Sequence, residues 1–119
     1  LNVVTEAEGT AAAVLIRGGE IVHGLELAAA YRFGAFDGSL TAARQRILSN
    51  GPGKLCKALN IDRSLNNLSA ASHPLYFADE LPELSLRKRP ASLPVHIGKR
   101  IGIDYAQEAA EFPWRFWLE

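Results

Sequence analysis

The most informative segment of this chain runs Asn50-Gly51-Pro52-Gly53-Lys54-Leu55-Cys56-Lys57-Ala58-Leu59-Asn60-Ile61-Asp62. Its Asn50-Gly51 pair is typical of a helix end. Proline is favoured at the first position of the next helix, where its missing N–H has no intrahelical partner to lose. Leu55, Cys56 and Leu59 then recur at helical spacing. We therefore predict a short helix that begins at Pro52 and has these three side chains on its inner face.

The same segment resembles a phosphate-binding loop. A nucleotide-binding loop needs glycine five residues before Gly53 and serine or threonine after Lys54. Those positions hold Leu48 and Leu55, so a nucleotide loop is excluded. Two interpretations remain. In the first, the helix start and Lys54 hold a single phosphate, such as one of a DNA backbone. In the second, the segment is a plain connection between helices. Taken by itself, the segment favours the second interpretation.

The flanking sequence predicts an α+β fold with a mostly antiparallel sheet and packed helices. Upstream we expect strands over Leu1–Glu6 and Ala11–Arg17, the second buried on both faces, and then two helices, one over Glu20–Arg32 and one capped by Ser39 and ending near Leu48. Downstream, the expected elements are an irregular loop over Asn60–Leu68, strands at Leu75–Ala78, Val95–Gly98, Arg100–Ile103 and Trp114–Leu118, a loop or edge over Leu81–Pro94, and a helix or turn over Ala106–Glu111.

Length and composition exclude several classes of protein. With 119 residues, 48% of them apolar and 22% charged, the chain is neither disordered nor collagenous and forms one domain or part of one. A single cysteine excludes an internal disulfide framework, and no apolar run reaches the about 20 residues of a membrane span. We expect a cytoplasmic protein without metal or cofactor. Because the chain has no methionine, we expect a processed protein or a segment of a longer fold.

The net charge is zero but unevenly distributed. Residues 1–53 sum to −1, residues 54–100 to +4 and residues 101–119 to −3. The basic middle is either an ordinary solvated surface, which charge alone favours, or a stripe that neutralises phosphates. The other candidate residues are better explained by structure than by chemistry. The three histidines have no ligand spacing, the cysteine is expected in the core, and the glutamate is expected on a solvated turn. The aromatic residues of the last strand either fill the core, which is favoured, or stack on bases. These residues are His23, His73, His96, Cys56, Glu108, Trp114, Phe116 and Trp117.

Three segments together resemble one enzyme family, the alkyladenine-type 3-methyladenine DNA glycosylases. The central segment, continued by Arg63-Ser64-Leu65-Asn66, is similar to the family pattern G-P-G-[KR]-L-C-x-A-L-x-I. The first strands are similar to the family's N-[VI]-[VS] and A-V-L-[IL]-R strands through Leu1-Asn2-Val3-Val4-Thr5 and Ala13-Val14-Leu15-Ile16-Arg17. The closing pattern R-[IV]-G-[IV]-x-x-A-G-E, followed by P-W-R-F, is matched by Arg100-Ile101-Gly102-Ile103-Asp104-Tyr105-Ala106, Glu108 and Pro113-Trp114-Arg115-Phe116.

The resemblance implies a partly open, barrel-like antiparallel sheet and an activity in base excision repair. The family flips an alkylated purine out of double-stranded DNA, and water then hydrolyses the N-glycosidic bond with no metal, activated by a glutamate. Asn2 matches the pocket asparagine that disfavours guanine, and Arg17 matches an arginine that helps to orient the water. Ile101 matches a residue whose backbone carbonyl holds that water. Lys54 and Arg63 fall where the family contacts the DNA backbone, which favours the second interpretation of the basic middle.

The departures from the family pattern limit what this chain is expected to do alone. The family's catalytic glutamate lies in an E-x-E-A-Y-type strand before the N-[VI]-[VS] strand, and residues 1–119 contain no such motif. Gln107 and Ala109 also replace a glycine and a tryptophan, which predicts a strained turn and either a smaller core or a looser DNA-facing edge. We expect the C-terminal portion of a glycosylase domain, inactive alone, with damaged DNA and the segment that carries the glutamate as partners and no membrane. It would act in the bacterial nucleoid, or in the nucleus of a eukaryote. The alternative is a non-enzymatic relative that binds nucleic acid or protein.

Overall fold

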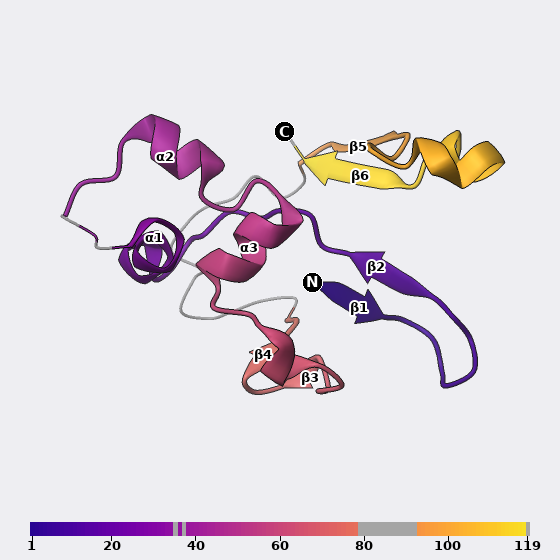
Figure 1. Cartoon of the computed structure of the whole chain (residues 1–119), viewed down its shortest axis with the longest axis horizontal. Helices are drawn as coiled ribbons and strands as arrows, with labels where there is room; N and C mark the ends of the chain where they lie inside the picture. Colours follow the sequence, from indigo (N-terminus) through magenta and orange to yellow (C-terminus); the bar gives the residue numbers. More distant parts are fainter. Residues whose placement is uncertain (35, 37, 79–92, 119) are drawn as a thin grey trace. The chain divides into compact units, whose positions relative to one another are not determined.

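The computed structural model describes residues 1–34, 36, 38–78 and 93–118. The chain divides into two compact units, Leu1–Asp79 and Glu80–Glu119, which are described separately below. Figure 1 shows the elements of both units. Among the described residues, no helix has the length and apolar composition needed to cross a bilayer. The segment 79–92, which includes most of the predicted Leu81–Pro94 loop, lies outside the described residues.

The first unit opens with an antiparallel hairpin formed within the two predicted strands. Strand β1 (Asn2–Val4) pairs with β2 (Ala13–Leu15) in the register Asn2↔Leu15, Val3↔Val14 and Val4↔Ala13. The expectation that the second strand is buried on both faces is wrong, because all three residues of β2 are exposed. The alternation of a half-buried strand is also missing from Ala13-Val14-Leu15, so the sequence alone cannot distinguish a covered strand from an uncovered apolar one.

Three short helices hold the core of this unit. They are α1 (Leu25–Phe33), α2 (Ala42–Ile47) and α3 (Pro52–Ala58), and α1 and α3 pack against each other. Helix α1 starts later than predicted because Gly24, with φ 67°, breaks the helical backbone just before Leu25. Thr41 rather than Ser39 caps α2: its side chain accepts a hydrogen bond from the N–H of Arg44 at 3.3 Å.

The buried core is small and consists of Ala28, Ala29, Leu48, Leu55 and Ala58. The prediction for α3 is therefore confirmed at Leu55, whereas Cys56 is half-buried and Leu59 is 44% exposed. Next to this core, the segment after β2 lies close to Ser49, the residue that follows Leu48. Ser49 Oγ donates to the carbonyl of Gly19 at 2.5 Å, and a Cβ on Gly18 would lie 3.0 Å from the carbonyl oxygen of Ser49. The absence of a side chain at Gly18 therefore lets two backbones approach closely.

The predicted irregular loop after α3 contains one turn of 3-10 helix, η1 (Arg63–Leu65). Two very short strands follow, β3 (Ala71–Ser72) and β4 (Leu75–Tyr76), which pair with each other antiparallel. The strand expected at Leu75–Ala78 is thus confirmed in its first half.

The second unit is a hairpin interrupted by a 3-10 segment. Strand β5 (Val95–Gly98) pairs antiparallel with β6 (Arg115–Leu118), as predicted for both, and η3 (Asp104–Ala110) lies between them. The strand expected at Arg100–Ile103 is wrong because Gly102, at φ 74°, turns the chain there. All described pairings are antiparallel, but the described strands form three separate two-stranded sheets and no closed barrel. The fold is mixed α+β.

Candidate nucleic-acid interface

A groove in the first unit brings together two of the residues singled out in the sequence. It has a volume of about 720 Å³ and is lined by β1, Cys56 of α3, residues 61–63 and 65–70, Leu75 and Phe77. Asn2 lines it from β1 and Arg63 lines it from η1, although they are 61 positions apart in the sequence. The backbone nitrogen of Leu1 lies 3.2 Å from Sγ of Cys56, which ties β1 to α3 at one wall.

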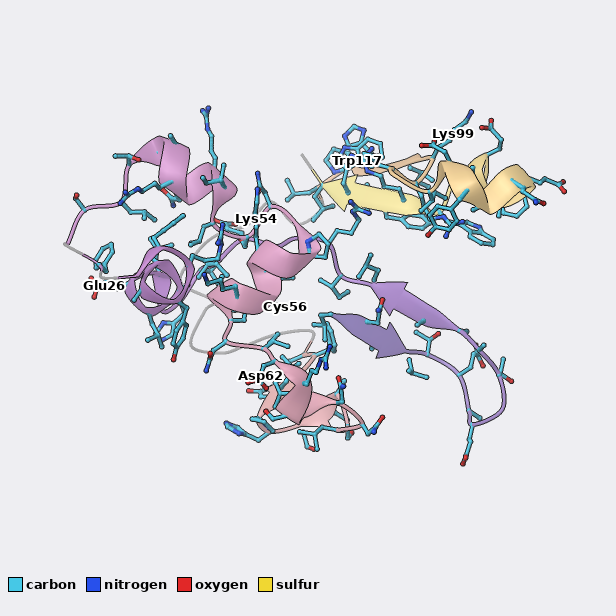
Figure 2. The ribbon with its side chains drawn as sticks, in the orientation of Figure 1. Glu26, Lys54, Cys56, Asp62, Lys99 and Trp117 are labelled. Carbon is cyan, nitrogen blue, oxygen red and sulfur yellow. The ribbon has the colours of Figure 1, made fainter. Side chains whose placement is uncertain are left out.

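Asp62 fixes the turn η1, which carries Arg63 in the lining of the groove. Its Oδ1 accepts a hydrogen bond from the N–H of Ser64 at 2.8 Å, and it is the N-cap of η1 (Figure 2). Hydrogen bonds from the side chain and then the backbone N–H of Ser64 hold the pKa of Asp62 below its ordinary value. The carboxylate is therefore charged at neutral pH. This role was not predicted from the sequence, although Asp directly before a helical turn is the ordinary signal of an N-cap.

Lys54 lies on the exposed side of α3, in its first turn. Its Nζ donates to Oδ1 of Asn50 at 2.9 Å. An amide oxygen is neutral, so the positive charge of Lys54 is not compensated by this contact. Arg63 is likewise exposed. Both side chains predicted to touch a DNA backbone are thus accessible to a polyanion.

Arg17 is also exposed, two residues beyond the end of β2. Its place follows from the hairpin, in which Leu15 stands opposite Asn2 and the N–H of Ile16 donates to the carbonyl of Leu1 at 3.0 Å. Ile101 belongs to the second unit, where its side chain is 57% exposed and Gly102 follows it. The roles that the resemblance assigns to Arg17 and Ile101 stay predictions.

Arg100 fixes the loop that contains Ile101. Its Nη2 donates to the carbonyl of Ala109 at 2.9 Å, and its guanidinium lies over the Trp114 ring at 5.1 Å from the centroid. Trp117 has two ring contacts within the hairpin: His96 stacks on it with the ring centroids 5.5 Å apart, and the Arg115 guanidinium lies 4.1 Å from its ring centroid. Trp117 is therefore occupied within the hairpin, whereas Trp114 and Phe116 are 58% and 63% exposed.

In the part of the chain that the structure describes, no three His, Cys, Asp or Glu side chains lie close enough to hold a metal ion. His23 and His73 are exposed, as is Glu108 on η3. Cys56 is half-buried and lines the groove instead of lying in the core as expected. The groove, with Asn2 and Arg63 in its lining, is the candidate site.

The family model for methylpurine-DNA glycosylases matches residues 1–119. The chain belongs to the methylpurine-DNA glycosylase family. Members of this family are DNA-repair enzymes that hydrolyse N-glycosidic bonds in damaged DNA.

Curated relatives of this family member carry the name "Putative 3-methyladenine DNA glycosylase". That from Desulfitobacterium hafniense (strain Y51) is 48% identical over 118 residues, which cover 99% of this chain and 54% of the relative. The relative from Clostridioides difficile (strain 630) is 40% identical, and the match covers 100% of this chain and 60% of that protein. The relative from Bacillus cereus (strain AH820) is also 40% identical, and the match covers 99% of this chain and 55% of that protein. The chain thus spans little more than half the length of these bacterial relatives.

Proposed function

We propose that this chain is the C-terminal part of a 3-methyladenine DNA glycosylase domain and supplies DNA-backbone contacts and part of the base pocket. The observation that carries the proposal is the family match over residues 1–119. The groove supports it, because Asn2 and Arg63 line one space although the resemblance assigned them separately. The whole enzyme would excise alkylated purines from the DNA of the bacterial nucleoid, by base flipping and hydrolysis of the N-glycosidic bond.

Each assigned residue then has a chemical role. Asn2 would disfavour guanine by a clash with its exocyclic amine, and Arg17 would help to orient the attacking water. The backbone carbonyl of Ile101 would accept a hydrogen bond from that water. Lys54 and Arg63 would neutralise phosphates, and such contacts position a protein on DNA without reading its sequence.

We assign the general base to a part of the domain that this chain does not match: the residues of the longer relatives that lie outside the aligned stretch. A general base contributes typically 10²–10⁴-fold to a rate, and the family resemblance places it in an E-x-E-A-Y-type strand that residues 1–119 do not contain. We therefore expect the isolated 119-residue chain to be inactive. The hairpins and their exposed apolar faces would join the strands of the remaining part in a barrel-like sheet of one domain.

Complementation tests this proposal. The purified chain is mixed with the part of the Desulfitobacterium hafniense relative that lies outside its 118 matched residues, and release of 3-methyladenine from alkylated duplex DNA is measured. We expect no release by either part alone and release by the mixture. The control mixture contains the Asn2→Ala and Arg17→Ala double variant, which should release far less.

Release by the chain alone would contradict the assignment of the general base to another part. A mixture that forms a complex but releases nothing favours the second candidate function, a non-enzymatic binding module. One observation favours that candidate: Gln107 replaces the family's glycine at a backbone conformation of φ 51° and ψ −128°. Loss of glycine at a conformation that favours glycine is expected in a relative that no longer depends on the family's activity.

A further inference from the structure

The exposed side of α3 carries a second lysine, Lys57, that the resemblance does not assign. The family pattern allows any residue at this position, so the lysine is a feature of this chain. At 3.6 residues per turn, Lys54 and Lys57 lie about 60° apart around the helix axis. Both are exposed, whereas Leu55 and Ala58 of the same helix are buried. The two ammonium groups therefore extend from one side of the helix.

Gly53 completes the exposed side of this helix. It is exposed, and a Cβ built on it would meet nothing within 4 Å. The surface next to the two lysines is therefore free of bulk, so that a sugar-phosphate strand can approach the helix backbone closely.

The charges near Lys57 favour a polyanion as the ligand. Helix α3 contains no acidic residue, and the contact of Lys54 is with the neutral amide of Asn50. Asp62, the first acid that follows along the chain, is engaged by Ser64 at the N-cap of η1. Since lysine carries its charge on a flexible four-carbon stem, two lysines three positions apart can reach neighbouring phosphates of one strand.

We propose that Lys57 adds a phosphate contact to DNA beside that of Lys54, so that α3 contacts the sugar-phosphate backbone through a lysine pair. This inference rests on the proposed DNA-binding function and adds to it a residue that the family pattern does not specify. The contact is independent of base sequence and of damage. It strengthens binding to duplex DNA in general and leaves the choice of lesion unchanged.

The salt dependence of DNA binding measures this contact. A fluorescein-labelled undamaged duplex is titrated with the 119-residue chain at a series of KCl concentrations, and binding is followed by fluorescence anisotropy. Each phosphate contact adds about 0.9 to the magnitude of the slope of log K against log[salt]. We expect Lys57→Gln to reduce that magnitude by about 0.9. Relative to equal binding at 1 M salt, where the phosphate term vanishes, this slope change lowers affinity at 0.1 M salt about eightfold.

Two variants make the comparison specific. Lys57→Arg keeps the charge and should retain the slope of the unmodified chain. Lys99→Gln removes the same charge from the protein, but Lys99 is already paired with Glu111 in the second unit, so its slope should also be retained. Lys57 is exposed, and circular dichroism of each variant checks that the fold is unchanged.

The outcomes separate this inference from the function on which it rests. If the unmodified chain shows a salt-dependent slope and Lys57→Gln shows the same slope, the lysine pair is refuted and DNA binding stands. If Lys99→Gln lowers the slope as much as Lys57→Gln, the effect is one of total charge and the contact is refuted. If the unmodified chain shows no salt-dependent binding, both the contact and the DNA-binding function fall.

Discussion

At the scale of single residues, Gln107 has a backbone conformation that residues other than glycine rarely adopt. Its φ of 51° and ψ of −128° interrupt η3. Glycine populates this part of backbone space readily, whereas other residues there cost of order 1–3 kcal/mol. The family pattern has a glycine at this position, so the strain predicted from the sequence at Gln107 has a structural counterpart.

We therefore expect Gln107→Gly to stabilise the protein. Relief of backbone strain outweighs the roughly 0.5–1 kcal/mol by which glycine favours the unfolded chain, and the net gain should be about 1 kcal/mol. Urea denaturation followed by tryptophan fluorescence measures it, since Trp114 and Trp117 both lie in the second unit.

Gln107→Ala is the matched control for this prediction. Alanine shortens the side chain but keeps a Cβ, so the strain remains and no comparable gain is expected. Equal stability of the glycine variant and the unmodified chain would contradict the account of strain at this turn.

At the scale of elements, local signals predicted some segments well and others poorly. Strands β5 and β6 and the start of α3 at Pro52 were predicted because alternation and proline position act within a few residues. The start of α1 and the turn at 100–103 were missed because Gly24 and Gly102 adopt positive φ values that the sequence does not announce. The groove was beyond prediction, since only the fold brings Asn2 to the same space as Arg63.

The turn η1 supports a prediction about pH. Asp62 accepts hydrogen bonds from Ser64 that are strongest when its carboxylate is charged, and its pKa is lowered in the folded protein. A depressed pKa contributes stability above the pKa of the unfolded state, about 3.9 for aspartate. That contribution is lost as the pH falls through the lower, folded value.

We expect Asp62→Ala to destabilise the protein at pH 7 and to have a smaller effect at pH 3. Urea midpoints of the two proteins at both pH values measure this difference. Asp62→Asn serves as control, because asparagine is also a good N-cap but does not titrate. A destabilisation by Asp62→Ala that is constant from pH 7 to pH 3 would show that the charge of the carboxylate does not contribute.

At the scale of the whole molecule, the described residues expose far more large apolar side chains than they bury. Within the core, only Leu48 and Leu55 are larger than alanine. The hairpin of β5 and β6 has one face that is consistently exposed and apolar, formed by Val95, Ile97, Phe116 and Leu118. Such a patch on an isolated chain favours association, and each two-stranded sheet also offers unpaired edges.

We therefore predict that the isolated 119-residue chain self-associates, and that the face of β5 and β6 contributes. Phe116 stands opposite Ile97 in the hairpin register and is 63% exposed. Burying one such side chain is worth about 1.5–3 kcal/mol, so Phe116→Lys should weaken association at least about tenfold. Sedimentation equilibrium over a range of protein concentrations measures this change.

Tyr105→Lys is the control, because it adds the same charge at a side chain that is 83% exposed on η3, and it should leave association unchanged. A chain that stays monomeric at every concentration, or an equal effect of both variants, would show that this face is not a contact surface. A complex with the remaining part of a relative's domain should suppress self-association if that part covers the same face.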